Sequence, residues 1–537
     1  MSLSTNPPTE RLKGSHVADR LPKAAAALLV LLTVARGLIY VLVIPPWQTP
    51  DEPSHFGYVR FVMQTHGLAA PRGAPVDPQI TASMVHFDFW RLRYHASGPS
   101  SSDLLNESRI ASGHPPLYYL LAALVLSPLR DQDVILQLYA LRLCSVLMAA
   151  STVLVAFRTV KLLFPDDPVL PLAVTAFIAF LPMHAFMSAS VNNDNLAELV
   201  ASLLVCLLVL ALRDGISPLK GVGVVILLGA GYFTKRTTFF TVPLVLAYMP
   251  IYCWTRAYSI RDASLTARRQ LASLASDAAK VARTMLRSHS LRYSLAIIAV
   301  LGLICGALWL FVSARRDGRR DNAIAWVQAA ATERQHLPLS TKVYNPSPPS
   351  RLEVTIGQIL KLVRVSPADF QSAFSAEGTG LSRIPSYLLF SLLTFASFWA
   401  NFGWMNIPLD PAWYALLAVI SLFAFLGLLL RILREIRSSG KQTLLPCRWQ
   451  KGALLILILA SFLIFVQTFG LMVVQNIPQQ GRYLFPAIVP LSTLFILGLS
   501  EVVPTRYRRG LPVICILSLF LFDALCLARY ILPHYYS

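Results

Sequence analysis

The segment AAAALLVLLTVARGLIYVLVIPPWQTPDEPSHF, residues 24–56, joins the two features that indicate the fold of this chain. Residues 24–44 are almost entirely apolar, and they are long enough to cross the hydrocarbon core of a bilayer as a helix. A proline-rich turn follows, and it carries two adjacent carboxylates, Asp51 and Glu52. The pattern predicts a membrane helix that delivers two acidic side chains to the membrane surface.

The composition of the whole chain is that of a membrane protein. Of its 537 residues, 55% are hydrophobic and 14% are charged, and the mean hydropathy of +0.57 excludes a water-soluble fold. We interpret the net charge of +20 as Lys and Arg retained on the cytoplasmic face, because no basic stretch is interleaved with aromatic residues that could stack on nucleic acid. The chain is therefore predicted to be an all-α, polytopic membrane protein whose partner is the lipid bilayer, with no nucleic acid.

The cysteines indicate packing and no covalent or metal chemistry. None of the 7 forms a CxxC pair or has metal-ligand spacing. They lie in apolar runs or in one basic loop, where small apolar residues pack: Cys144, Cys206, Cys253, Cys305, Cys447, Cys515 and Cys526. No disulfide or zinc site is predicted.

A search with a window of about 20 residues predicts the membrane spans. The eleven spans cover residues 24–44, 134–157, 169–188, 194–212, 219–234, 238–254, 293–313, 411–431, 452–474, 484–503 and 511–531. Residues 1–23 are polar and basic and lack a signal-peptide cleavage pattern, so the first span is predicted to be an uncleaved anchor with a cytoplasmic N-terminus. Residues 24–531 then form one transmembrane domain, followed by a tail of residues 532–537.

Two further apolar stretches, 115–129 and 386–404, are interpreted from the charges around them. The basic loops 255–292 and 431–451 both belong in the cytoplasm, and a full crossing at 386–404 would place the second of them outside. A crossing at 115–129 would likewise export basic side chains. Both stretches are rich in Trp and Tyr, and both are predicted to be juxtamembrane helices in the outer interface.

This topology leaves two long loops outside the cell. The first is 45–133, with the acidic pair, and the second is 314–385. The second is external despite four arginines near its start, because long loops follow the charge rule poorly. Its proline-rich middle, YNPSPPSR, is suited to capping a cavity and recognising an acceptor.

Polar residues from distant parts of the sequence meet on the outer side in this topology. The acidic pair Asp51 and Glu52 is joined there by His55, by His114, by Asn192, Asn193 and Asp194 in SVNNDNLAE, by Lys235 and Arg236 in GYFTKRTT, and by Arg482 and Tyr483 in IPQQGRYLFP. A carboxylate just outside the hydrocarbon can act as general base toward an acceptor hydroxyl. Arg and Lys at headgroup depth can bind a lipid-linked phosphate and stabilise it as it departs. The expected reaction is glycosyl transfer.

Five motifs in order along the chain support this expectation by resemblance. PDEPSHF, HPPLYYLLA at 114–122, the NNDN turn, SFWANFGWM and QGRYLFP together resemble a family of bacterial membrane proteins within the GT-C glycosyltransferase superfamily, over about residues 24–531. The resemblance implies a polyprenyl-phosphate-linked sugar donor. It also implies a catalytic base or metal ligand in the first external loop, Asp51 or Glu52, and a second acid in the next external loop, Asp194. A divalent cation at Asp51 and Asp194 stays open.

Each of these residues also has a structural interpretation. Asp51 and Glu52 could form a turn and an N-cap, and Asp194 could be an N-cap that follows a turn at Asn192 and Asn193. His55 and His114 could pack within loops. Lys235, Arg236 and Arg482 could anchor the chain at the membrane interface. These alternatives predict the same sequence pattern without catalysis.

Other function classes also fit a chain rich in spans. A transporter or flippase for lipid-linked glycans should place ionisable residues near the middle of the bilayer on broken helices, and a non-catalytic partner in polysaccharide assembly would not need paired acids. No Walker A, GxGxxG or HExxH motif occurs. We predict a multi-pass protein of the inner membrane that acts on a glycan, lipid or protein acceptor.

Overall fold

A computed structural model describes residues 9–65, 67, 74, 76–94, 110–261, 384–437, 445, 447–475 and 480–536. Within these ranges the regular secondary structure is helical apart from one hairpin. In it the two-residue strand β1 (Asn401–Phe402) pairs antiparallel with the two-residue strand β2 (Ile407–Pro408). Residues 262–383 lie outside the described residues. They include the predicted span 293–313 and nearly all of the predicted loops 255–292 and 314–385.

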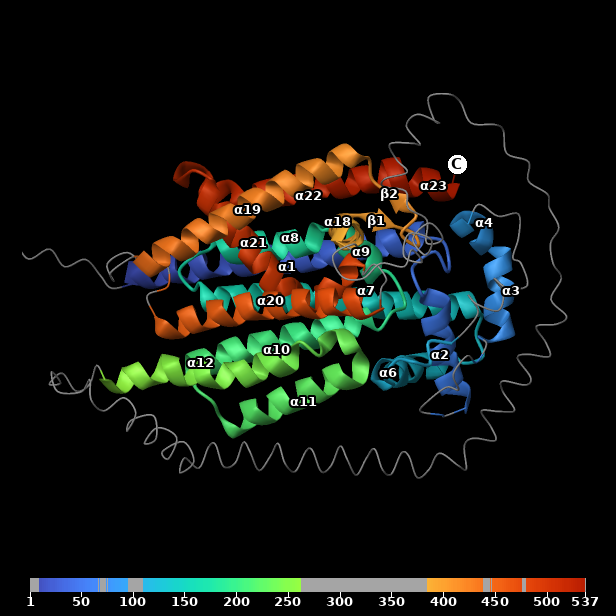
Figure 1. Cartoon of the computed structure of the whole chain (residues 1–537), viewed down its shortest axis with the longest axis horizontal. Helices are drawn as coiled ribbons and strands as arrows, with labels where there is room; N and C mark the ends of the chain where they lie inside the picture. The colour runs from blue at the N-terminus through green and yellow to red at the C-terminus, as the bar shows by residue number, and fades with distance from the viewer. Residues whose placement is uncertain are drawn as a thin grey trace, which may run out of the picture.

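Ten long or bent helices lie side by side in the described part of the chain and form the bundle (Figure 1). They are α1 (Thr9–Val43), α7 (Val134–Leu163), α8 (Val169–Phe180) with α9 (Pro182–Ser188), α10 (Asp194–Asp214), α11 (Pro218–Thr234), α12 (Thr241–Arg261), α19 (Pro411–Arg437), α20 (Arg448–Gln475), α21 (Ile488–Val502) and α22 (Leu511–Leu525). Bundle helices joined by described residues run in opposite directions, whereas α12 and α19, which are separated by residues 262–383, run the same way (Figure 1).

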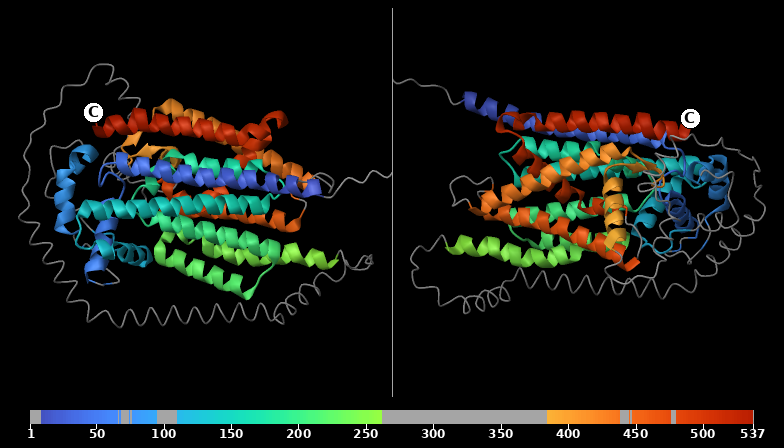
Figure 2. Two further views of the ribbon diagram at one scale, coloured as in Figure 1. Left: turned by 180° about the vertical axis from the view of Figure 1, so that it is seen from behind. Right: turned by 45° about the horizontal axis from the view of Figure 1, so that its top comes forward.

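Smaller elements gather mainly at one end of this bundle, which we call the cap end (Figures 1 and 2). It carries α2 (Glu52–Thr65), α3 (Pro78–His86), α4 (Phe89–Tyr94), α6 (Leu117–Leu126) with η1 (Ser127–Leu129), η2 (Arg236–Thr238), the hairpin, η4 (Gly481–Ala487), the π-helix η6 (Cys526–Ile531) and α23 (Leu532–Tyr536). η5 (Thr505–Gly510) precedes α22 at the other end. The helix α18 (Ile384–Trp399) stands across the bundle near the cap end (Figure 2).

The lengths of the helices confirm the predicted class. Within the described ranges, eight helical segments are long and apolar enough to cross a membrane. The predicted span 169–188 is instead a bent pair, α8 and α9, with a 60° angle between its parts, and the predicted span 219–234 is the shorter apolar helix α11. The protein is therefore an all-α polytopic membrane protein, whereas the predicted number of eleven spans is not confirmed.

Local sequence explains the bend in the third predicted span. Leu181 has extended backbone angles (φ −64°, ψ 117°), and Pro182 begins α9. Proline disfavours helical geometry at the residue before it and cannot donate to the preceding turn, so α8 ends and a new helix starts. The carbonyl of Leu181 accepts from the Ala185 amide of α9 at 3.2 Å and also from Nη2 of Arg36 on α1 at 2.9 Å.

Two separate hydrophobic cores hold the molecule together. The larger one fills the bundle and includes residues of α1, α7, α8, α10, α20 and α21. The second lies in the cap end, where Trp47 and Phe56 pack with side chains of α3, α6 and the start of α7. The segment 45–56 belongs to this second core, so the acidic turn is built into a packed structure and is not a free loop.

The end opposite the cap is rich in positive charge. Lysines and arginines near the helix ends there are Arg158, Lys161, Arg213, Lys220, Arg256, Arg431, Arg434, Arg437, Arg448, Lys451, Arg506, Arg508 and Arg509. Three of these arginines, Arg431, Arg434 and Arg508, form ion pairs with the same carboxylate, that of Glu501. We call this the basic end.

Candidate active site

The acidic turn that follows α1 holds Asp51 in an unusual conformation. Trp47 and Asp51 both have positive φ, at 71° and 65°, a region that costs energy for residues with a side chain. The Asp51 carbonyl accepts from the His55 amide at 3.0 Å, which starts α2. The Asp51 side chain remains 45% exposed. Backbone strain of this kind is typical of functional sites.

Four charged side chains from four distant segments meet beside this turn. Nη2 of Arg482 donates to Oδ2 of Asp51, and Nε of Arg482 lies 3.7 Å from Oδ2 of Asp194. The Nζ atom of Lys235 lies 2.6 Å from Oδ1 of Asp194. We call Asp51, Asp194, Lys235 and Arg482 the ionic cluster. Arg482 links its two carboxylates directly.

The backbone places Arg482 through a close contact that only glycine permits. Arg482 belongs to η4, and the residue before it, Gly481, packs on the backbone of Phe398 in α18. A Cβ atom added at Gly481 would lie 2.1 Å from the Phe398 nitrogen. The Gly481 amide also donates to Oγ of Ser397 at 2.8 Å. α18 therefore determines where the Arg482 guanidinium lies.

The turn before α10 places Asp194 in a similar way. Oδ1 of Asn192 accepts from the Asp194 amide at 3.0 Å, and Nδ2 of Asn193 donates to the Thr234 carbonyl at 3.1 Å. Thr234 directly precedes Lys235, so the Asn193 bond holds the turn beside the lysine. Asn193 occupies the N-cap position without a side-chain cap bond, and the Asp194 carboxylate faces the two cations. The N-cap interpretation of Asp194 does not describe this geometry.

Several buried polar atoms of the cluster lack hydrogen-bond partners in the described part of the chain. They are Nε and Nη1 of Arg482, both carboxylate oxygens of Asp194, which face the cations as ion pairs, and, on residues around the cluster, Nδ2 of Asn192, Oδ1 of Asn193 and Oε1 of Gln480. The Arg482 side chain is only 1% exposed. Buried polar groups are normally paired, and unpaired ones need an explanation. Nη1 of Arg482 makes no hydrogen bond and Nε has only its 3.7 Å contact with Asp194, so these nitrogens and Lys235 are suited to binding an anion.

Two histidines and a tyrosine form the walls around the cluster. The rings of His55 and His114 lie 5.2 Å apart, and Nδ1 of His55 lies 2.7 Å from the Tyr119 hydroxyl. Burial lowers the pKa of His55, and burial together with the charge of Lys235 lowers the pKa of His114 to about 4, so both rings are neutral near pH 7. Tyr483 lies under the cations, with Lys235 Nζ 5.3 Å from its ring centre.

Glu52 has a different place from the one predicted for a catalytic residue. Its side chain is 0% exposed and pairs with Arg142 of α7, whose Nη2 lies 2.6 Å from Oε2 and whose Nε lies 2.9 Å from Oε1. Both oxygens therefore point into the protein, away from the ionic cluster. We assign Glu52 no catalytic role, because a carboxylate that is fully buried and engaged cannot reach an acceptor.

The other predicted residues divide into two groups. His55, His114, Asn192, Asn193, Lys235, Arg482 and Tyr483 lie at or around the ionic cluster, as their contacts show. Arg236 does not: it is exposed, and its carbonyl accepts from Gln467 at 3.2 Å. Lys235 thus faces the cluster, whereas Arg236, the first residue of η2, is turned outward.

Sequence reasoning missed two buried pairs near the site. Arg142 is a lone arginine inside the apolar run 134–157. A charged side chain in such a run normally has a partner, so the sequence did indicate that Arg142 is paired. His184 of α9 contacts Glu198 of α10 at 2.8 Å, and Glu198 lies one helical turn after Asp194. A carboxylate four residues from Asp194 on the same helix was the signal for the second pair.

The cluster does not fit a divalent cation. Within the ranges described, no three His, Cys, Asp or Glu side chains come together as metal ligands. Arg482 contacts both Asp51 and Asp194, so a metal ion between these carboxylates would face a guanidinium and the Lys235 ammonium at short range. The two cations occupy the electrostatic role that a metal would have.

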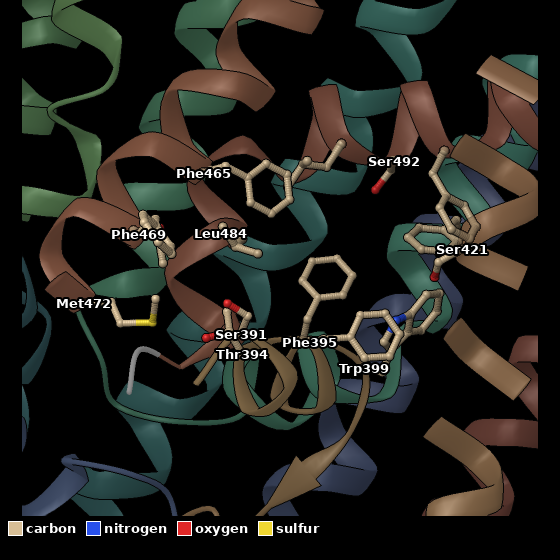
Figure 3. A pocket seen from close by; sticks show the side chains of 15 residues that line it. Ser391, Thr394, Phe395, Trp399, Ser421, Phe465, Phe469, Met472, Leu484 and Ser492 are labelled. Carbon is tan, nitrogen blue, oxygen red and sulfur yellow. The ribbon is translucent and has the colours of Figure 1, made fainter. Parts of the chain in front are cut away.

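An apolar cavity of about 300 Å³ lies between α8, α18, α20 and α21 (Figure 3). Aromatic side chains of α8, α18, α20 and α21 form most of its wall, with hydroxyls of a few Ser and Thr residues between them. Leu484 of η4 and Phe398 of α18 both line it, and these two elements also place Arg482. The elements that place Arg482 thus also form part of the cavity wall.

The fold and the site define a class of protein: a polytopic helical membrane protein with a strained acidic turn and a buried ionic cluster at one end of the bundle, and an apolar cavity between α8, α18, α20 and α21. Residues 35–491 match the family described as predicted membrane protein DUF2142. The chain belongs to this family. No curated protein matches the sequence.

Solved structures of two membrane enzymes are similar in part. One is the archaeal oligosaccharyltransferase AglB from Archaeoglobus fulgidus, in complex with an inhibitory peptide and a dolichol-phosphate (14% identity, TM-score 0.46, covering 96% of this chain and 56% of that chain). Another is ArnT from Cupriavidus metallidurans bound to undecaprenyl phosphate (12% identity, TM-score 0.40, covering 94% and 73%). The chain spans about half the length of the oligosaccharyltransferase. These scores are too low to establish a shared fold.

Proposed function

We propose that this protein is a membrane glycosyltransferase of the GT-C kind, which moves a sugar from a polyprenyl-phosphate-linked donor to an acceptor hydroxyl or amide. One observation carries the proposal: buried Arg482 lies between the Asp51 and Asp194 carboxylates with two guanidinium nitrogens that make no hydrogen bond, and its element η4 also lines an apolar cavity. An anionic headgroup with an apolar tail satisfies both features at once. A soluble anion would leave the cavity without a role.

The donor phosphate binds Arg482 and Lys235 in this proposal. A guanidinium can contact two phosphate oxygens in its plane, and a lysine adds a point charge. The isoprenoid tail enters the cavity between α18 and α20, where aromatic and aliphatic side chains replace water around it. The two cations then stabilise the phosphate as it leaves the sugar.

Asp51 is the base in the transfer step. It takes the proton from the acceptor, the acceptor atom bonds to the anomeric carbon, and the bond from that carbon to the phosphate oxygen breaks. In the free protein, desolvation raises the pKa of Asp51, but its positive neighbours, Arg482 above all, lower it more. A carboxylate with so low a pKa is a weak base. When the donor phosphate takes over Arg482, the pKa of Asp51 rises and the carboxylate becomes an effective base.

The reaction takes place on the outer side of the inner membrane in this proposal. Positive side chains collect at the basic end, and Lys and Arg are retained in the cytoplasm in membrane proteins. The cap end with the ionic cluster then faces the periplasm, and the N-terminus of α1 is cytoplasmic (Figure 1).

Thiol labelling of intact cells tests this orientation. Ser127 is exposed in η1 at the cap end, and the natural Cys447 is exposed at the basic end. We expect Ser127→Cys to react with a membrane-impermeant maleimide from outside, whereas Cys447 reacts only after the cells are opened. Outside labelling of Cys447 in a chain without the Ser127→Cys change would reverse the proposed orientation.

Filling the cavity tests the tail site. Ser421 on α19 lines the cavity, with its hydroxyl bonded to the Leu417 carbonyl at 2.7 Å. Ser421→Trp should raise the KM for a long-chain donor about 10-fold or more, because exclusion of two buried CH₂ groups costs about 1.6 kcal/mol. The KM for a donor with one or two isoprene units should change little.

Ser518→Trp is the matched control for the cavity variant. Ser518 lies on the exposed face of α22 and makes the same type of bond, to the Ile514 carbonyl at 2.7 Å. Its substitution should leave both KM values unchanged. Equal KM values for long and short donors in Ser421→Trp would place the tail elsewhere.

A lipid transporter or flippase is the second candidate, and one set of contacts favours it. Arg36 of α1 bonds to Leu181 at the break between α8 and α9, and it lies 3.6 Å from Asp523 of α22. Buried charges on a broken span are typical of transporters. The pair shares no residue with the ionic cluster.

Purified protein in liposomes separates the two candidates. With a labelled polyprenyl-phosphate sugar and candidate acceptors in the same compartment, a transferase forms product and free polyprenyl phosphate, whereas a flippase only moves the donor between leaflets. In cells, mass spectrometry of lipid-linked intermediates with and without the protein should show one polyprenyl-phosphate sugar accumulating when the protein is missing. Movement without product would favour the transporter.

A further inference from the structure

A buried ion pair joins the two acidic turns of the site without entering it. Arg142 is 0% exposed, and besides Glu52 it donates to the backbone carbonyls at the end of α1: to Ile44 at 2.7 Å, Pro45 at 3.1 Å and Val41 at 3.3 Å. One side chain of α7 thus satisfies the carbonyls that the helix end leaves open. The start of the acidic turn is held by these bonds.

Glu52 connects the same turn to the second acid. Its Oε2 accepts from the Trp47 amide at 3.2 Å, and its Oε1 accepts from the Val191 amide at 3.1 Å. Trp47 has positive φ and precedes Asp51 in the strained turn, whereas Val191 begins the turn that ends in Asp194. A single buried carboxylate therefore bonds both turns, and its charge is balanced by Arg142.

We propose that Glu52 and Arg142 are positioning residues that hold Asp51 and Asp194 at the spacing the transfer reaction requires. The inference rests on the proposed function for its catalytic consequence, but the spacing itself is a property of the free protein. A strained φ at Asp51 persists only where surrounding contacts determine it, and Glu52 supplies one contact within this turn, at Trp47, and one to the other acidic turn, at Val191. The cation that balances the Glu52 carboxylate is the Arg142 guanidinium.

Glu52→Gln tests the pair with little change in volume. The amide has one acceptor oxygen where the carboxylate has two, and its NH₂ group faces the Arg142 donors, so the Trp47 or the Val191 amide loses its acceptor. We expect kcat to fall about 10²-fold, as for a displacement of reacting groups by about 1 Å. The KM for the donor should stay within about threefold, because Arg482, Lys235 and the cavity are intact.

Asp77→Asn is the matched control. Asp77 forms a second buried carboxylate–arginine pair in the cap end, with Nη2 of Arg60 at 2.7 Å, and it also accepts from the Gln79 amide at 2.9 Å. The pair holds α2 to α3 and touches neither acidic turn. Asp77→Asn should lower the melting temperature as much as Glu52→Gln or more while kcat remains near the value of the unsubstituted protein.

Hydrogen exchange measures the positioning without any substrate. In Glu52→Gln, exchange should accelerate at least 10-fold in peptides that report the Trp47 and Val191 amides, and it should stay unchanged around Gln79. Asp77→Asn should give the opposite pattern. Unchanged exchange at both Trp47 and Val191 would overturn the inference whatever the activity. Accelerated exchange with unaltered kcat would overturn its catalytic part.

A double variant keeps the test decisive if Glu52→Gln folds poorly. Glu52→Gln with Arg142→Met removes both buried charges, and such replacements are often tolerated. If the pair contributes only stability, the double variant recovers both folding and kcat. If it positions the turns, the double variant folds but kcat stays about 10²-fold low, because the two backbone amides still share one acceptor. Should no donor be found at all, the exchange data alone support or reject the positioning.

Discussion

Asp51→Asn should reduce sugar transfer by about 10²-fold or more, as expected when a general base is removed. Asn keeps the size of the side chain and tolerates the positive φ of 65° observed at this position. The Asp51 side chain is 45% exposed, so the change leaves no deeply buried gap. The variant should insert, fold and bind the donor while losing turnover. The measurement is product formation by purified protein in liposomes with a labelled donor.

The chain contains a close control for Asp51→Asn. Asp88 is also an aspartate with positive φ (52°), and it also pairs with an arginine, Arg91, at 3.0 Å. Its side chain is 58% exposed and lies in the cap end between α3 and α4. Asp88→Asn should leave transfer unchanged. If Asp51→Asn transfers sugar as fast as Asp88→Asn, the turn has a structural role only, as a cap before α2.

The pH dependence of transfer gives a second readout of Asp51. In the free protein the carboxyl has a lowered pKa, so its proton is lost far into the acid range and kcat/KM should be flat above it. Once a donor phosphate occupies Arg482, the pKa rises, and kcat should fall on acidification at a higher pH than kcat/KM does. Asp51→Asn should abolish this acid limb. Coincident limbs would mean that the donor does not displace Asp51 from Arg482.

Arg482→Ala should lower kcat/KM for the donor by about 10²–10³-fold, the range for loss of one donor to a developing anion. Its guanidinium is 1% exposed and contacts both cluster carboxylates, so removal leaves Asp51 and Asp194 to repel the phosphate. Arg482→Lys should restore only part of the activity, because lysine cannot contact the phosphate and the carboxylates through one planar group. Steady-state kinetics over a range of donor concentrations measure both variants.

Arg60→Lys separates phosphate binding from the general cost of changing a buried arginine. Arg60 is 4% exposed and also pairs with a carboxylate, Asp77, in the cap end. Arg60→Lys should reduce the stability of the protein about as much as Arg482→Lys does, but it should leave the KM for the donor unchanged. Full activity of folded Arg482→Ala would remove Arg482 from the donor site and leave the cavity without its proposed ligand.

Hydropathy predicted most spans correctly because a span is a local property of about 20 residues. Eight helices long and apolar enough to cross a membrane confirm this within the described residues, and the ends of α1, α7, α19 and α20 lie near the predicted ones. The exceptions are also local. Pro182 divides the predicted span 169–188, and α11 has 17 residues, which is short for a crossing. The span 293–313 lies outside the described residues.

The sequence by itself determined the all-helical membrane class and which polar motifs lie at one end of the bundle, since chain length between spans and alternating direction limit where a loop can lie. It could not assign partners. Asp51 and Arg482 are 431 residues apart, and Glu52 and Arg142 are 90 apart. Two adjacent acids looked equivalent in PDEPSHF, but the positive φ at Asp51 and the buried guanidinium of Arg142 direct them to opposite sides. Only packing of α7, α10, α18 and η4 decided which carboxylate is exposed beside a cation, because a buried charge is tolerated only where the tertiary structure supplies its counter-charge.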